Sequence, residues 1–258
     1  MGGEKILAGL IAAAGVSWLA ACARDKPITV GSKNFTEQVI LGEIVAQHVS
    51  LRLSQRVDRK LNLGGTLLAH QAMVQGGLDL YPEYTGTALT TILKLPFTSD
   101  PAEALARVRL EYETRFRIYW LDPLGFNNTF AMVIRGEDAR RNRIESLSEA
   151  ARYAAGKEGW RLGVGYEFQQ RPDGLPGLLK TYKLPLKGLP KTMDLGLLYK
   201  ALEQKQVDMV AANATDGQLA AMDVTVLKDD RRYFPPYQAA LTVRADTLAA
   251  HPGLKDAL

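Results

Sequence analysis

Residues 28–40, ITVGSKNFTEQVI, place a strand signal directly before a helix signal. The β-branched run 28–30 is closed by Gly31, which predicts a short strand. Apolar residues then recur at helical spacing from Val39 onward, and Thr36 stands where a helix cap is expected. A strand that passes directly into a helix is the repeating unit of an α/β fold.

The same alternation of strand and helix signals continues along the chain. Further strands are expected at 57–63, 78–81, 131–134, 161–164 and 207–211. Helices are expected at 67–75, 85–93, 101–112, 146–155, 176–182, 195–204 and 215–222. Ser146 and Glu149 also have the spacing of a capping box. The pattern predicts an α/β fold with a mainly parallel sheet, and its return in the second half predicts two lobes with a ligand crevice between them.

Composition and charge exclude several classes of protein. Of 258 residues, 47% are hydrophobic, which argues against a disordered, collagen-like or coiled-coil chain. The net charge is +4, and the densest basic run, 135–143, contains two acids and no aromatic residue, so nucleic-acid binding is not expected. A single cysteine excludes a disulfide framework and a cysteine-based zinc site, and three histidines leave little material for any metal centre.

The first 22 residues are typical of an export signal. An apolar run of 14 residues, 6–19, follows Lys5 and ends in small residues, and it is too short to span a bilayer comfortably. Residues 19–22, LAAC, resemble a bacterial lipobox, in which Cys22 would carry the lipid; the alternative is an ordinary signal peptide with an incidental cysteine. We therefore predict a protein exported to the periplasm or cell surface and anchored to the membrane by lipid.

The sequence contains no recognisable catalytic motif. The pair of glycines at 163–165 lacks the third glycine of a dinucleotide fingerprint, and neither a Walker-type GK[ST] nor a G-x-S-x-G elbow occurs. His70 lies in a helical pattern and is expected to be a packed or surface residue. We therefore expect a protein that is not an enzyme and that needs no cofactor.

Other residues are better suited to holding a small molecule. Tyr81, Tyr84 and Tyr237 stand beside turns, where an aromatic face could bind a cation, although they could equally be core residues with satisfied hydroxyls. Arg171 lies four residues after Glu167 and could clamp a carboxylate, or the two could form only a surface ion pair.

Six motifs, in order, resemble those of the bacterial osmoprotectant-binding proteins, the OpuAC/ProX-like receptors of glycine betaine, carnitine and choline ABC importers. They are GSKNFTEQ at 31–38, YPEYTGT at 81–87, PLGFNNT at 123–129, RPDGLPGLLKTY at 171–182, TDGQ at 215–218 and FPPY at 234–237. The resemblance implies a type II periplasmic-binding-protein fold whose ligand cleft lies between lobes. The first lobe would hold 28–127 plus 236–258 and the second 128–235. Relatives continue past 251–254 through a further helix, whereas this sequence stops at Leu258, in a helical pattern beginning near Pro252.

The resemblance also implies which residues bind the ligand. Aromatic faces would surround a quaternary ammonium: Tyr84, Phe130 and Tyr237. Polar groups would contact the rest of the ligand: Lys33, Thr87, Asn128, Glu167, Arg171 and Asn213. Relatives usually carry tyrosine at the positions of Phe130 and Asn213, so one wall of the cage is expected to be lost. Either a quaternary ammonium is then bound more weakly, or the ligand is more polar.

The expected function is capture of a small quaternary-ammonium or zwitterionic osmolyte and its delivery, by a monomer, to an ABC permease with its ATPase subunits. One alternative keeps the fold and the transport role but assigns an amino acid or an ergothioneine-like betaine as the ligand. Another, from a different class, is an exported enzyme that uses Glu167 as acid or base. A sensor that signals on closure would have the same sequence features.

Overall fold

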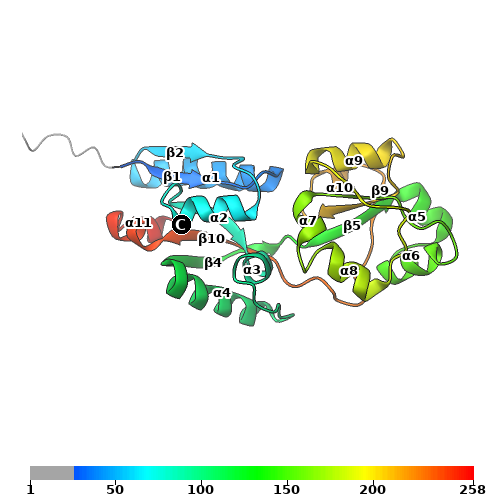
Figure 1. The fold of residues 1–258 in the computed structure, drawn as a ribbon. Coiled ribbons are helices and arrows are strands. Elements are labelled where there is room, and N and C mark those ends of the chain that lie inside the picture. The colour runs from blue at the N-terminus through cyan, green and yellow to red at the C-terminus, as the bar shows by residue number, and fades with distance from the viewer. Residues whose placement is uncertain (1–25) are drawn as a thin grey trace, which may run out of the picture.

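The computed structural model describes residues 26–258, which form two lobes, each built on a five-stranded sheet with helices on its faces (Figure 1). The predicted signal peptide 1–22 and the lipidation site Cys22 lie outside the described residues. Two segments connect the lobes, one between β4 and β5 and one between β9 and β10.

The sheet of the first lobe has the strand order β2-β1-β3-β10-β4. Its strands are β1 (Ile28–Gly31), β2 (Val57–Lys60), β3 (Leu80–Tyr84), β4 (Ile118–Asn127) and β10 (Gln238–Arg244). Its helices are α1 (Thr36–Leu53), α2 (Thr66–Val74), α3 (Thr85–Thr87), the π-helix η1 (Ala88–Ile92), α4 (Pro101–Phe116), α11 (Ala245–Ala250) and α12 (Leu254–Ala257). The last of these packs against α1, where Leu254 joins the core.

The sheet of the second lobe has the order β7-β6-β8-β5-β9. Its strands are β5 (Phe130–Arg135), β6 (Leu162–Val164), β7 (Lys191–Thr192), β8 (Met209–Asn213) and β9 (Val224–Val226). Its helices are α5 (Gly136–Asn142), α6 (Leu147–Ala154), α7 (Tyr166–Gln170), α8 (Leu175–Tyr182), α9 (Leu195–Glu203) and α10 (Gln218–Ala221).

The two-lobed α/β fold is confirmed, but the expectation of a mainly parallel sheet is wrong. In the first lobe β1 runs parallel to β2 and β3, whereas β10 runs antiparallel to β3 and β4. The second lobe repeats this arrangement, with β6 parallel to β7 and β8, and β5 antiparallel to β8 and β9. The antiparallel pairs arise because β5 and β10 enter their sheets directly after the chain has crossed from the other lobe.

Two helix starts test the capping predictions. Ser146 accepts from the amide of Glu149, whose carboxylate accepts in return from the amide of Ser146, so the predicted capping box is confirmed. Thr36 is not a cap, because the N-cap of α1 is Phe35, which makes no side-chain cap hydrogen bond.

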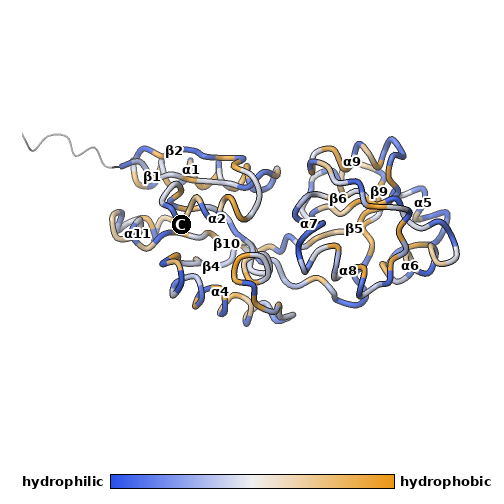
Figure 2. The backbone as a smooth tube through the Cα atoms, in the orientation of Figure 1, coloured by the Kyte–Doolittle hydropathy of each residue, from blue (hydrophilic) through white to orange (hydrophobic). Residues whose placement is uncertain are grey.

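Apolar side chains fill both faces of each sheet. Strand β3 is buried along its whole length, and the interior of β5 is buried as well. In Figure 2 the apolar stretches run through the interior of the lobes, as along β5, while surface helices such as α5 are hydrophilic. These buried strands hold their carboxyl ends in fixed positions, and the polar residues at those ends face the space between the lobes.

Candidate ligand-binding site

A cavity of about 330 Å³ lies between the two lobes, and residues of both lobes line it. All nine residues that the sequence nominated for ligand contact lie on its wall: Lys33, Tyr84, Thr87, Asn128, Phe130, Glu167, Arg171, Asn213 and Tyr237. The volume suits a small molecule, since ligand pockets typically measure about 300–1,000 Å³.

Strand ends explain why these residues meet. Lys33 follows β1, Tyr84 ends β3, Glu167 follows β6 and Asn213 ends β8. The carboxyl ends of parallel strands lie at the same edge of a sheet, so residues far apart in sequence gather there. Each lobe presents such an edge, and the two edges face one another across the cavity.

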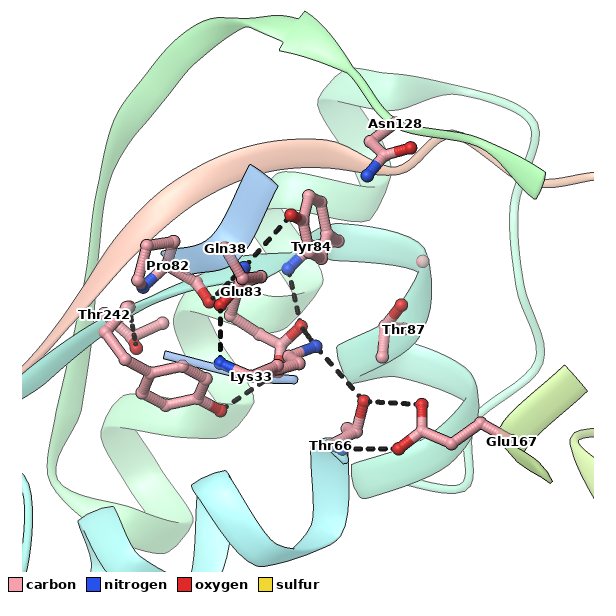
Figure 3. Close-up of polar contacts among 12 residues, drawn as sticks. Lys33, Gln38, Thr66, Pro82, Glu83, Tyr84, Thr87, Asn128, Glu167 and Thr242 are labelled. Carbon is pink, nitrogen blue, oxygen red and sulfur yellow. Dashed lines mark hydrogen bonds and ion pairs between the residues drawn. The ribbon is translucent and has the colours of Figure 1, made fainter. Parts of the chain in front are cut away.

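Lys33 forms a fully buried ion pair with Glu83. Its Nζ lies 2.5 Å from Oε1 of Glu83, and the two side chains are 3% and 0% exposed. A second hydrogen bond, of 3.1 Å, runs from Nζ to the hydroxyl of Thr66 (Figure 3). Glu83 is held in place by the hydroxyl of Tyr81 and the amide of Tyr84. The positive charge of Lys33 is therefore already balanced within the protein. Tyr81, fully buried, is a core residue outside the cavity wall.

Arg171 is paired in the same way with Asp173. Nε and Nη2 of Arg171 donate to the two carboxylate oxygens of Asp173 at 3.0 and 2.5 Å. Burial alone would lower the pKa of Arg171, but the hydrogen bonds and charge of Asp173 outweigh it and raise that pKa. Nη1 donates across the interface to the hydroxyl of Thr87, in the first lobe, at 3.1 Å. Arg171 therefore stays protonated and links the lobes.

Glu167 also links the lobes. Its Oε2 accepts from the hydroxyl of Thr66 at 2.9 Å, and its Oε1 accepts from the amide of the same residue, the first of helix α2. In Figure 3 the side chain reaches from the second lobe to the start of this helix. The approach depends on Gly65, since a Cβ atom at that position would clash with Oε1. Nη1 of Arg171 lies 3.8 Å from Oε2.

Aromatic rings form the apolar side of the cavity. The ring of Phe130 lies 5.6 Å from that of Tyr237 and 4.8 Å from that of Phe168, both in edge-to-face contact. The guanidinium of Arg171 lies 4.9 Å from the Phe130 centroid, and Nζ of Lys33 lies 5.1 Å from the Tyr84 centroid. These distances are within the range of cation–π contacts, so the rings already have cationic neighbours.

The tyrosine hydroxyls of the cavity wall are hydrogen-bonded to carboxylates of the protein. Tyr84 donates to Glu37 at 2.5 Å, and Tyr237 donates to Asp173 at 2.6 Å. Burial, followed by the charge of these carboxylates, raises the pKa of both tyrosines, so the hydroxyls remain protonated donors. Because each hydroxyl donates its proton within the protein, the rings are the parts of these tyrosines that offer an apolar face to a ligand.

The polar residues Asn128 and Asn213 complete the set. Asn128 donates to Glu37 at 3.0 Å from Nδ2. Asn213 lies opposite Phe130 in the pairing of β5 with β8, so the two positions where relatives are expected to carry tyrosine are neighbours on the cavity wall. The backbone amide of Asn213 donates to the carboxylate of Asp216 at 3.1 Å.

Sequence reasoning did not nominate eleven of the twenty lining residues, and among these are three that contact or adjoin nominated ones. Phe35 stacks on Tyr84 with ring centroids 6.0 Å apart, Tyr166 is 61% exposed beside Glu167, and Thr66 joins Lys33 to Glu167. Phe35 belongs to a quoted motif, and Tyr166 begins the helix that follows β6, so both carried a usable signal. Thr66 could not be identified as a site residue from the sequence, because its hydrogen-bond partners Lys33 and Glu167 are 33 and 101 residues away.

Residues 26–258 do not meet the requirements of two other types of site, a metal centre and a membrane-spanning helix. No group of three metal-ligating side chains occurs there, and no helix in that range is long and apolar enough to cross a membrane.

Two α/β lobes with a small cavity of polar and aromatic residues between them have the architecture of a solute-binding protein. The family described as "Substrate binding domain of ABC-type glycine betaine transport system" matches residues 26–258, and the chain belongs to this family. A solved glycine betaine/carnitine/choline ABC transporter structure superposes with a TM-score of 0.72 at 29% identity, covering 89% of this chain and 84% of the other.

Relatives differ in the ligand that their names specify. The glycine-betaine-binding protein of Pseudomonas aeruginosa is 35% identical over 256 residues, which cover 96% of this chain and 81% of the relative. The ergothioneine transport permease/ergothioneine binding protein EgtU of Helicobacter pylori is 34% identical over 233 residues, or 88% of this chain. The match spans only 40% of the length of that relative.

Proposed function

We propose that this protein captures a small quaternary-ammonium or zwitterionic osmolyte and delivers it, as a monomer, to an ABC permease and its ATPase subunits. The observation that carries the proposal is the interlobe cavity, because its wall combines aromatic rings with buried polar groups contributed by both lobes. A cavity of that kind can surround an ammonium group and orient the rest of a small ligand.

Closure of the lobes is the proposed signal to the permease. The first lobe would comprise 28–127 plus 236–258 and the second 128–235, with the two connecting segments as hinges. A ligand that touches both lobes binds the closed form more tightly than the open form and shifts the population toward it. No covalent chemistry is required for this role, and both oxygens of Glu167 are engaged by Thr66, which disfavours an acid–base role.

The alternative that we propose is a more polar class of ligand. Asn213 replaces an aromatic wall with an amide, which favours a more polar ligand such as an amino acid or an ergothioneine-like betaine. The similarity to the ergothioneine-binding relative supports the same alternative.

A thermal-shift screen tests the ligand. The purified protein is melted with glycine betaine, choline, carnitine, ergothioneine and amino acids, and a ligand at 100 times its Kd should add about 2.7 kcal/mol of stability. Phe130→Ala should lose the shift relative to its own ligand-free melting temperature. Leu189→Ala, at a 92% exposed position of the second lobe, should keep it. The absence of any shift across the whole panel would refute the proposed function.

Export and lipid anchoring form a separate part of the proposal, based on the pattern of residues 1–22. Metabolic labelling with a radioactive fatty acid should mark the native protein but not Cys22→Ser. Labelling of both would show that the lipid is attached elsewhere.

A further inference from the structure

Each positive group of the cavity already has a buried negative partner. Lys33 is paired with Glu83 and Arg171 with Asp173, and both carboxylates have 0% side-chain exposure. Buried ion pairs of this kind are retained because breaking one leaves an uncompensated charge in a poorly solvated site. A ligand carboxylate would therefore compete with partners that cannot move into water.

One further carboxylate, Glu167, lines the cavity, and a second, Glu37, lies behind its wall against Tyr84 and Asn128; among the described residues neither has a cation of its own to balance it. Glu37 accepts hydrogen bonds from the neutral groups of Tyr84 and Asn128, and within residues 26–258 it forms no ion pair. Glu167 accepts from Thr66 and lies 3.8 Å from Arg171, which is already neutralised. The two cations of the site are thus accompanied by four carboxylates: Glu83, Asp173, Glu37 and Glu167. The exposed Asp194 at the rim adds to the excess rather than offsetting it.

Glu167 also stands where a ligand carboxylate would have to bind. The donors beside Glu167 are the backbone amide and hydroxyl of Thr66 and Nη1 of Arg171, which also donates to Thr87. Glu167 occupies the amide and the hydroxyl and faces the guanidinium. In Figure 3 its carboxylate lies against Thr66, which in turn contacts Lys33. The protein thereby fills its own anion-binding position.

We propose that the cavity selects a ligand with a net positive charge and no carboxylate, and that Glu167 is the residue that determines this specificity. The inference rests on the proposed function and narrows its ligand class. A quaternary ammonium alcohol fits: its cationic head meets the ring faces of Phe130 and Tyr84 in a field of excess negative charge. Its hydroxyl can donate to Glu167. A zwitterion of the same size places its carboxylate beside that of Glu167.

A matched pair of ligands tests the proposal with the native protein alone. Choline and glycine betaine share the trimethylammonium head and differ at the other end, where one carries a hydroxyl and the other a carboxylate. By titration calorimetry we expect choline to bind at least about tenfold more tightly than glycine betaine. Equal affinities, or tighter binding of glycine betaine, would overturn the proposal while leaving the proposed function intact. Binding of neither compound would instead count against the proposed function, and the inference would fall with it.

The variant Glu167→Gln assigns the selectivity to this residue. It keeps the shape and an acceptor oxygen but removes the charge, so choline should bind about tenfold more weakly while glycine betaine keeps or gains affinity. Glu137→Gln is the matched control, since that glutamate is paired with Lys205 and neither residue lines the cavity. If Glu167→Gln weakens both ligands equally, or changes neither, the charge of Glu167 does not set specificity. If the variant folds poorly, the ratio of choline affinity to glycine betaine affinity in the native protein still tests the proposal.

Discussion

At the scale of single residues, Asn213 offers the simplest way to alter the cavity. It lies beside Phe130 on neighbouring strands and presents an amide where an aromatic face would complete the cage. Asn213→Tyr should raise the affinity for a trimethylammonium ligand about two- to thirtyfold, because one cation–π contact contributes about 0.5–2 kcal/mol. Calorimetry measures the gain. Asn213→Leu adds bulk without a π face, and an equal gain there would show that packing alone is responsible.

His70 is expected to make the first lobe sensitive to acid. Its ring packs edge-on against Tyr112 and Phe116, with centroids 5.4 and 4.6 Å away. Burial, with a smaller contribution from the charge of Lys33, lowers the pKa of His70 to about 4. In the unfolded chain the value is about 6.5, so between these two pH values the unfolded state binds more protons.

The stability that His70 contributes should therefore be complete above about pH 6.5 and be lost as the pH falls toward 4. We expect a loss on the order of 1–2 kcal/mol, because solvent screens part of the shift at a half-buried ring. Denaturant unfolding of the native protein and of His70→Phe at a series of pH values measures it. The variant should show a shallower decline across this window, and parallel curves would contradict the assignment.

At the scale of elements, the start of α6 makes a contribution to the free energy of unfolding that can be measured. Ser146 and Glu149 satisfy one another's backbone amides there. Ser146→Ala should lower the free energy of unfolding by about 1 kcal/mol, the usual effect of removing a side-chain cap. Denaturant melts compare it with Glu149→Gln, which keeps an acceptor and should lose less. A larger loss in the glutamine variant would indicate that charge, rather than hydrogen bonding, stabilises this helix start.

Elements with a strong local pattern could be predicted from the sequence, and those fixed by distant partners could not. The helices from 101 and 146 and the buried strands β1, β5 and β6 follow apolar periodicity. Strand β4 was not predicted, because Asp122, Pro123 and Gly125 interrupt its apolar pattern. Its pairing with β10 also contains register shifts. Strand β10 is apolar enough to be a strand, but its antiparallel direction depends on where the chain re-enters the first lobe.

The cavity, too, could be predicted only in part from local sequence patterns. Motifs located its wall, yet the pairing of Lys33 with Glu83 joins positions 50 residues apart, and that of Glu167 with Thr66 joins positions 101 apart. No local rule connects such positions. The sequence therefore indicated which residues meet at the cavity but not which charges cancel there.

At the scale of the whole molecule, contacts between the lobes exist before any ligand is considered. Glu167 reaches Thr66, Arg171 reaches Thr87, and the hydroxyl of Tyr237 reaches Asp173. Glu167→Ala removes the first of these and should shift the ligand-free protein toward the open form. Small-angle X-ray scattering would show a larger radius of gyration. Glu137→Ala, whose partner Lys205 lies in the same lobe, should leave the radius unchanged. Equal radii in both variants would mean that Glu167 does not hold the lobes together.

The position of β10 also sets an order of events for a chain that must fold after synthesis. Every strand of the second sheet comes from residues 130–226, so that sheet can assemble from one continuous stretch. Among residues 26–258, strand β4 stands at the edge of the first sheet and pairs with β10 alone, so residues 118–127 stay unpaired until residues 238–244 arrive. Contacts between such distant segments form late and slowly. The lobe that begins first in the sequence is therefore expected to be completed last, and its sheet stays open until residues 238–244 have been made.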